Sequence, residues 1–411
     1  MAESIPVLRV AGGHREVGRA VGAATAPVLR EAVAFNAALP AGRSRDEQLA
    51  LAARYREATR AGTPWLVEEI DGAAEGAGVD PLALFAASIE EIWTVRPSQA
   101  GTTEPVPGRC SDLAIGPPFT ADGHLWVAHT NDLGEASEAQ LVAVEWRVPG
   151  EPVVFSLGIG PWISVGWNDA GLSLTGNELT PNDERVGVPR LLMVREQLTA
   201  RTLDEAVAMA LRPDRASSYN TVFAHRDGRA ANVEGSGGDA VVRPIGPGET
   251  LAHTNHYLEP AMLRYEGDPA YARHSAIRYE RGCALLAGAA AAGPGTVTPA
   301  LLHAWLSDHD GTPDSICRHP ATPVGTPRPD ASPAGQADAA PAGQADAAPA
   351  VSVDEADAAP AGQADAAPAV SVDEGTVKTV FWTIVDVTAG MIWYGRGNPC
   401  AGAEPDWFAF S

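Results

Sequence analysis

Residues 108–132 read GRCSDLAIGPPFTADGHLWVAHTND, and this stretch decides how the chain is expected to fold. A run that alternates like a strand begins at Cys110, turns at Asp122-Gly123, and continues as a second run that ends near Asp132. This pattern predicts two strands joined in a β-hairpin. Because a hairpin returns the end of its second strand to the start of its first, we expect Cys110 and Asp132 to lie close together.

A thiol beside a carboxylate at the mouth of a sheet is a candidate nucleophile. Cys110 fits this description if the hairpin forms as predicted. A lone cysteine is also commonly a small apolar residue of the core. Spacing alone therefore leaves both interpretations of Cys110 open.

Seven further segments, spread along the chain in a fixed order, carry motifs of one protein family. They are Val10–Gly22, Gly171–Asn177, Gly187–Arg190, His253–His256, Ser307–His309, Ser315–His319 and Met391–Cys400. Together with the Cys110–Asp132 run, this set resembles the acyl-coenzyme A:6-aminopenicillanic acid acyltransferase (isopenicillin-N acyltransferase-like) family of autoproteolytic N-terminal nucleophile cysteine hydrolases. The resemblance covers nearly the whole chain outside one insertion. It implies an α+β fold, a four-layer αββα sandwich of antiparallel sheets.

The resemblance also implies a mechanism centred on Cys110. Self-cleavage between Arg109 and Cys110 would free the α-amine of Cys110. That amine could take the thiol proton near neutral pH, because its reference pKa is about 7.7–8.0. Asp132 would hold the amine, while the side-chain amides of Asn255 and Asn177 would stabilise the oxyanion of the tetrahedral intermediate.

Alternative interpretations stand beside these roles. Asp132 could be a turn residue, and the two asparagines could be strand-end caps, since such side chains commonly bond the local backbone. Arg318 matches a pocket arginine that would bind substrate, or it could form a surface ion pair. Fungal relatives carry Gly where Arg109 stands, and Thr is common where Ser111 stands. A Cβ at the scissile residue makes a strained turn harder to adopt.

Composition excludes several classes of protein. The 411 residues carry a net charge of −23, which argues against binding nucleic acid. No apolar run approaches the roughly 20 residues of a membrane helix, and the N-terminus lacks a secretory pattern. Four cysteines in a chain of this length do not suggest a disulfide framework. We therefore expect a cytoplasmic protein whose partners are a small acyl substrate and its own cleaved N-terminal chain.

Three regions are expected. Residues 1–109 form a helical segment that becomes the small chain, and residues 110–411 form the catalytic chain. Residues 321–375 repeat an acidic Pro/Ala/Gly pattern that cannot bury enough apolar area to fold, so we expect a disordered insertion. Helices are expected over 14–90, 188–200, after 202, 274–290 and 298–308, with strands over 111–179, 221–225, 230–234, 377–387 and 391–395.

Histidines and cysteines recur in the second half of the chain. They are His253, His256, His303, His309, Cys317 and His319. Their spacing fits no standard zinc pattern, since His303 and His309 are six positions apart and only Arg318 separates Cys317 from His319. The sequence therefore predicts no metal, and the proposed chemistry requires no cofactor.

The leading interpretation is an autoprocessing cysteine amidohydrolase or acyltransferase that acts on small N-acyl amides through a thioester on Cys110. One alternative is an acyl-coenzyme A-dependent N-acyltransferase of secondary metabolism. Another is a binding member of the fold without catalytic activity, left unprocessed because Arg109 blocks cleavage. The sequence does not encode the acyl group or the amine, which depend on pocket shape.

Overall fold

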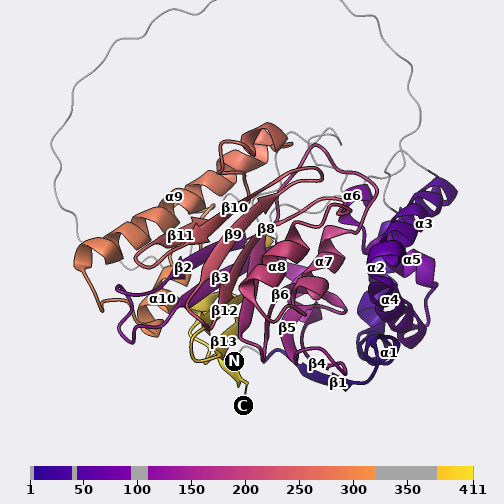
Figure 1. Ribbon diagram of the computed structural model, residues 1–411, viewed down its shortest axis with the longest axis horizontal. Helices are drawn as coiled ribbons and strands as arrows, with labels where there is room; N and C mark the ends of the chain where they lie inside the picture. Colours follow the sequence, from indigo (N-terminus) through magenta and orange to yellow (C-terminus); the bar gives the residue numbers. More distant parts are fainter. Residues whose placement is uncertain (1–3, 39–43, 94–109, 321–376, 411) are drawn as a thin grey trace, which may run out of the picture. The chain divides into compact units, whose positions relative to one another are not determined.

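Two β-sheets lie face to face at the centre of the described chain (Figure 1). The structure is a computed structural model that describes residues 4–38, 44–93, 110–320 and 377–410. Arg109 and the predicted insertion 321–375 lie outside the described residues. No helix among the described residues is long and apolar enough to cross a membrane.

The first sheet has eight strands, in the order β1-β4-β5-β6-β7-β8-β9-β10. Their bounds are Val7–Ala11, Leu141–Arg147, Val154–Ile159, Trp162–Asn168, Leu172–Asn177, Asn220–His225, Ala230–Gly235 and Ala240–Ile245. All neighbours pair antiparallel except β1, which joins β4 in parallel. No strand was predicted over β1 from the sequence.

The second sheet has six strands, in the order β11-β2-β3-β12-β13-β14. Their bounds are Thr250–His253, Cys110–Ile115, Trp126–Gly134, Val377–Asp386, Met391–Arg396 and Asp406–Ala409. The hairpin predicted from residues 108–132 is confirmed, because β2 pairs antiparallel with β3 and places Cys110 opposite Asn131. The strand β12 pairs with the other side of β3.

Strand alternation distributes the apolar side chains between separate layers. Ala114 on β2 joins the cluster between the two sheets, whereas its neighbours Leu113 and Ile115 pack against the helices outside. The same division separates Ala143 from Val144 on β4. Because successive side chains point to opposite faces, a strand buried on both faces needs a continuous apolar run. The predicted four-layer αββα sandwich is therefore confirmed.

Helices cover both outer faces. The helices α7 (Arg190–Gln197) and α8 (Leu203–Ala210) pack on the eight-stranded sheet. The helices α9 (Pro269–Ala292) and α10 (Pro299–Leu306) pack on the other sheet, and Figure 1 shows α9 running beside β2 and β11.

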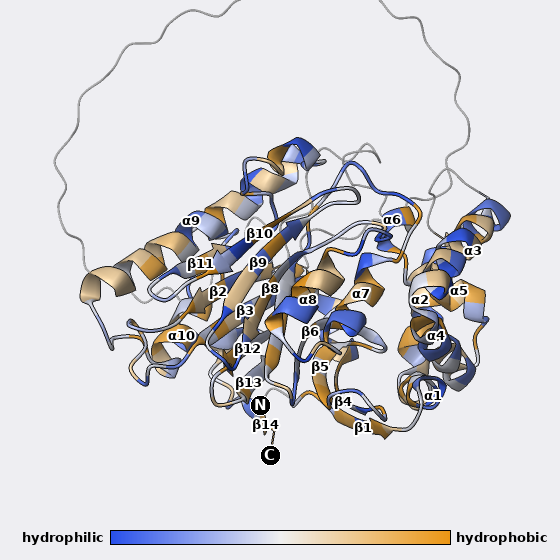
Figure 2. Cartoon of the chain, viewed as in Figure 1, coloured by the Kyte–Doolittle hydropathy of each residue, from blue (hydrophilic) through white to orange (hydrophobic). Residues whose placement is uncertain are grey.

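The N-terminal segment is helical, as predicted for residues 14–90. Its helices are α1 (His14–Ala24), α2 (Ala26–Ala38), α3 (Arg45–Gly62), α4 (Pro64–Ala77), α5 (Pro81–Ala87) and α6 (Glu90–Trp93). Figure 2 shows that α3 is mostly hydrophilic, whereas β1 is hydrophobic. An apolar cluster joins these helices to Leu192 and Met193 of α7, so the N-terminal segment packs on the rest of the chain.

Glycines set the distance between α1 and α4. A Cβ added to Gly18 would lie 2.0 Å from the carbonyl oxygen of Glu69, and one added to Gly72 would lie 2.2 Å from that of Arg15. Backbones can approach this closely only where no side chain intervenes. Gly18, which belongs to the Val10–Gly22 segment of the resemblance, therefore serves helix packing.

Candidate active site

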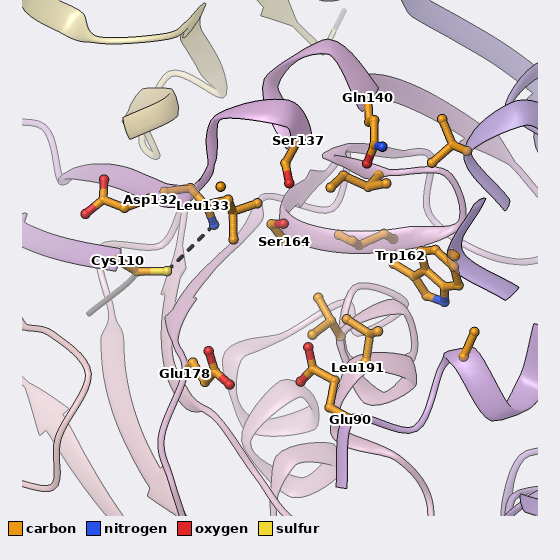
Figure 3. A pocket seen from close by; sticks show the side chains of 18 of the residues that line it. Glu90, Cys110, Asp132, Leu133, Ser137, Gln140, Trp162, Ser164, Glu178 and Leu191 are labelled. Atoms are coloured by element: carbon orange, nitrogen blue, oxygen red, sulfur yellow. Dashed lines mark hydrogen bonds between the residues drawn. The ribbon is translucent and has the colours of Figure 1, made fainter. Parts of the chain in front are cut away.

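Cys110 stands at the first position of β2 and is 6% exposed. Its sulfur faces a cavity, and Figure 3 shows a hydrogen bond that reaches this sulfur. The donor is Nδ2 of Asn131, at 3.6 Å from Sγ. Asn131 is the register partner of Cys110 on β3, so both side chains share one face of the sheet.

The cavity has a volume of about 850 Å³ and extends from Cys110 to α2. Its apolar lining includes Val28, Phe35, Leu133, Ile159, Trp162, Leu174, Leu191 and Val194. Its ionisable lining is acidic and includes Glu31, Glu90, Glu135 and Glu178. No lysine, arginine or histidine lies among the described lining residues. Arg190 does not line the cavity, but its guanidinium forms ion pairs with two of the lining carboxylates, Glu90 at 2.8 Å and Glu178 at 3.0 Å.

Asn255, two residues beyond β11, holds the backbone of Cys110. Its Oδ1 accepts hydrogen bonds from the N–H of Cys110 and from the guanidinium of Arg278, both at 2.9 Å. Only an oxygen can accept from two such donors, so the orientation of the amide is fixed. Its Nδ2 consequently donates to the carbonyl oxygen of Glu178 at 3.0 Å.

Asn177, at the end of β7, lines the same cavity. Its Oδ1 accepts from Nδ2 of Asn220 and lies 3.0 Å from Nδ1 of His253. These contacts fix its amide as well, and its Nδ2 has no hydrogen-bond partner among the described residues. A buried donor without a partner costs free energy, about 1–3 kcal/mol, and such groups concentrate at functional sites.

Asp132 follows Asn131 on β3, so its side chain takes the opposite face of the strand. Figure 3 shows its carboxylate pointing away from the Cys110 sulfur. Oδ1 accepts from the hydroxyl of Thr379 at 2.8 Å, while Oδ2 has no hydrogen-bond partner among the described residues. Burial raises the pKa of Asp132 to about 6, although the charges of Arg278 and Arg318 oppose this rise.

The thiol of Cys110 is held in its neutral form. Burial raises the pKa of Cys110 far above its usual range, and the negative charges of Asp132 and Asp112 raise it further. The charge of Arg278 acts in the other direction without overcoming them. A thiolate nucleophile at this position consequently needs a nearby base to take its proton.

Arg318 does not line the cavity in the described part of the chain. Its Nη1 lies 3.3 Å from Oδ1 of Asp314, and burial lowers its pKa while the charge of Asp132 raises it. The backbone N–H of Arg318 donates to Oγ1 of Thr379 at 2.9 Å. The substrate-binding role of Arg318 stays a prediction.

Sequence reasoning did not identify two residues that contact Cys110. Asn131 could have been found, because the predicted hairpin register places it directly opposite Cys110. Arg278 gave no such signal, because it is one of several arginines on the long helix α9. Its Nη1 donates to the carbonyl oxygen of Cys110 and, at 2.9 Å, to Oγ of Ser111.

The sequence also matches a known family. The profile described as "Acyl-coenzyme A:6-aminopenicillanic acid acyl-transferase" matches residues 122–322. This segment is therefore similar to that family. This match agrees with the resemblance found in the sequence. No curated protein sequence matches the chain significantly.

Several solved structures are similar to this chain at low identity. A mutant of the conjugated bile acid hydrolase from Clostridium perfringens is 12% identical, with a TM-score of 0.42, covering 74% of this chain and 97% of that one. Penicillin V acylase from Agrobacterium tumefaciens is 11% identical, with a TM-score of 0.35, covering 73% and 86%. A Caenorhabditis elegans ortholog of N-acylethanolamine-hydrolyzing acid amidase is 15% identical, with a TM-score of 0.34, covering 49% and 87%.

Proposed function

We propose that this chain is a self-processing cysteine amidohydrolase that acts on small N-acyl amides through a thioester on Cys110. The observation that carries the proposal is the setting of Cys110. Its sulfur faces the apolar cavity, while its backbone N–H is held by the side chain of Asn255 at 2.9 Å. Nucleophile and backbone nitrogen are therefore fixed at one place, as they must be if the nitrogen is to become the base.

Processing comes first. The Cys110 sulfur attacks the carbonyl carbon of Arg109, the C–N bond breaks, and the proton of the thiol ends on the departing nitrogen. Water then hydrolyses the thioester, which gives chains 1–109 and 110–411 and restores the thiol. Asp132 supports this step because it is a buried carboxylate with an unpartnered oxygen among the described residues. An ammonium group formed at Cys110 would relieve the cost of burying that charge.

Turnover repeats the same chemistry on a substrate. The α-amine takes the thiol proton, the sulfur attacks the amide carbonyl, and the amine product leaves with the proton that the α-ammonium returns. Water activated by the same amine then attacks the thioester, and the acid is released. Nδ2 of Asn177 is a suitable oxyanion donor because it is buried, fixed and without a partner among the described residues.

The cavity favours one substrate class. Its apolar lining suits the hydrocarbon part of an acyl group, and its volume of about 850 Å³ falls within the range of small-molecule sites. An acidic lining without a cationic side chain in the described part suits a neutral or cationic amine component. Coenzyme A carries several phosphates, which such a lining would repel. We therefore favour amide hydrolysis over transfer from acyl-coenzyme A.

The test combines polypeptide mass with product analysis. The wild-type protein should give two chains that separate at the Arg109–Cys110 bond, and Cys110→Ala should remain one chain. Incubation with a panel of N-acyl amides should release free acid and trap a Cys110 adduct of acyl mass. A dominant N-acylated product from acyl-coenzyme A plus amine would instead establish the acyltransferase alternative.

A binding protein without catalytic activity is the remaining alternative, since Arg109 replaces the glycine of fungal relatives. Such a protein would stay a single chain after prolonged incubation and would form no acyl adduct. The cytoplasmic location expected from the sequence also stays a prediction.

A further inference from the structure

Four metal-binding side chains converge outside the cavity, where the chain before residue 320 meets the C-terminal region. They are His309, Cys317, His319 and Cys400, and one donor atom of each lies within 4.8 Å of all the others. Cys400 belongs to the short 3-10 helix η5 (Pro399–Ala401) that follows β13. We propose that these four side chains bind a zinc ion in a Cys2His2 site.

One atom, Nε2 of His319, lies close to a donor atom of each of the other three residues. Nε2 of His319 lies 3.1 Å from Nε2 of His309, 3.2 Å from Sγ of Cys400 and 3.7 Å from Sγ of Cys317. A ring nitrogen carries at most one hydrogen, so ordinary hydrogen bonding cannot satisfy three such neighbours. A cation between the four atoms satisfies all of them at once.

The spacing also fits the geometry of zinc. With Zn–N bonds of about 2.0–2.1 Å and Zn–S bonds of about 2.3 Å, the donor atoms of a tetrahedral site are about 3.3–3.8 Å apart. The three distances from His319 Nε2 run from 3.1 to 3.7 Å, close to the edges of such a tetrahedron. Two thiols with two imidazoles are a donor set that zinc prefers, and four protein ligands make the site structural rather than catalytic.

A neighbouring amide supports the site. Nδ2 of Asn398 donates to Sγ of Cys317 at 3.5 Å and to the carbonyl oxygen of Arg318 at 2.6 Å. Hydrogen bonds to a coordinating thiolate orient it and stabilise its charge. Cys317 and Cys400 are both thiols rather than a disulfide, and Cys400 is exposed, so an ion can reach the cluster from solvent.

The site would join two distant parts of the chain. Cys400 lies 81 positions after His319, and between them the described chain is interrupted after residue 320. Binding would tie the segment that leads to this interruption onto η5. It would also fix Arg318, whose backbone contacts Thr379, the residue that donates to Asp132. The inference stands apart from the proposed amidase chemistry, because none of the four ligands lines the cavity.

Metal analysis of the full-length protein tests the proposal. Protein expressed with added zinc and purified under reducing conditions should hold about one zinc ion per chain. Cys400→Ser and His309→Ala should each lose most of it. Cys283→Ser and His303→Ala are the matched controls, because these residues lie outside the cluster, and both should retain zinc. A wild type without bound zinc, or a Cys400→Ser/His309→Ala double variant that keeps it, would overturn the proposal.

Cobalt substitution provides a second test that needs no variant to fold. Cobalt added to the metal-free wild-type chain should give the strong visible bands of a tetrahedral site and a near-ultraviolet thiolate-to-cobalt transition. Neither feature should depend on amidase activity, so this result is separable from the proposed function. Spectra of octahedral cobalt, or a Cys317–Cys400 disulfide in the reduced preparation, would reject the site.

Discussion

The side-chain oxygen of Asn255 accepts a hydrogen bond from the backbone N–H of Cys110 at 2.9 Å, although 145 positions separate the two residues. The bond spans two elements of the same sheet, because Asn255 follows β11 and β11 pairs with β2. Its amide nitrogen faces the carbonyl oxygen of Glu178. This amide therefore connects Cys110 to Glu178, and both residues line the cavity.

The first prediction distinguishes the role of the Asn255 side-chain oxygen from that of its nitrogen. Asn255→Asp keeps an oxygen for the Cys110 nitrogen and removes the donor, whereas Asn255→Ala removes both. If the donor stabilises the oxyanion, both variants should lower kcat by roughly a hundredfold on a confirmed N-acyl amide, the usual effect of one lost oxyanion donor. Steady-state kinetics of both variants, measured on processed protein, test this expectation. A near-normal kcat for Asn255→Asp would limit Asn255 to holding Cys110.

The second prediction concerns Asn177, whose Nδ2 has no partner among the described residues. Asn177→Asp preserves an oxygen for Asn220 and His253 while it removes the unpartnered donor. We expect kcat to fall roughly a hundredfold. Asn177→Ala should in addition lower the melting temperature, because the buried Nδ2 of Asn220 loses its acceptor. Unchanged turnover in Asn177→Asp would show that this nitrogen takes no part in catalysis.

The hairpin at Cys110 could be predicted because its information is local. Alternation and the Asp122-Gly123 turn determine which positions face each other, and the structure pairs Cys110 with Asn131. The sequence did not show that Asp132 turns its carboxylate away from the sulfur. That follows from the strict alternation of β3, where the register partner and its neighbour take opposite faces. Closeness of backbones was therefore predictable, and the direction of the carboxylate was missed.

Contacts between distant segments could not be predicted in the same way. Arg278 reaches Cys110 because α9 packs on β2 and β11, which brings together residues 168 positions apart in the sequence. The proposed zinc ligands are a similar case. His309, Cys317 and His319 show no standard spacing, and Cys400 joins them only after β12 and β13 have formed a hairpin.

The third prediction uses the raised pKa of Asp132. Its pKa rises from 3.8 to about 6, mainly through burial, so the folded chain binds this proton more tightly than the unfolded chain. The contribution to stability is fully present below pH 3.8 and is lost as the pH rises through about 6. We expect a loss on the order of 3 kcal/mol in the free energy of unfolding of unprocessed Cys110→Ala.

Denaturant titrations at pH 4 and pH 7 measure this effect. In the Cys110→Ala background, Asp132→Asn should stabilise the chain more at pH 7 than at pH 4, because asparagine never acquires the buried charge. Asp122→Asn is the control, since that carboxylate is partly exposed on a turn and its pKa is lowered. An equal effect of Asp132→Asn at both pH values would contradict the assignment.

The last prediction concerns a ring of charges between the two predicted chains. His14 of α1 lies 3.2 Å from both Glu69 of α4 and Glu151, which precedes β5. Arg195 of α7 contacts the same two carboxylates, at 3.1 and 2.9 Å. Two members belong to residues 1–109 and two to residues 110–411, so the ring should hold the small chain in place after processing.

Titration of His14 should weaken this ring at alkaline pH. Burial alone would lower the pKa of His14, but hydrogen bonds and charges of Glu151 and Glu69 outweigh it and raise the pKa from 6.5 to about 9. The contribution of His14 to stability is fully present below pH 6.5 and is lost as the pH rises through about 9. Because the side chain is 18% exposed, we expect a loss on the order of 2 kcal/mol.

Thermal unfolding of the unprocessed Cys110→Ala chain between pH 6.5 and pH 9.5 tests this linkage without the complication of chain dissociation. His14→Gln should lower the melting temperature at pH 6.5 and have much less effect at pH 9.5. His303→Gln is the control, because burial lowers the pKa of His303, the opposite direction to the shift of His14. In processed wild type, the small chain should also begin to dissociate near pH 9. If His14→Gln is equally destabilising at both pH values, packing on Trp65 rather than charge accounts for the role of His14.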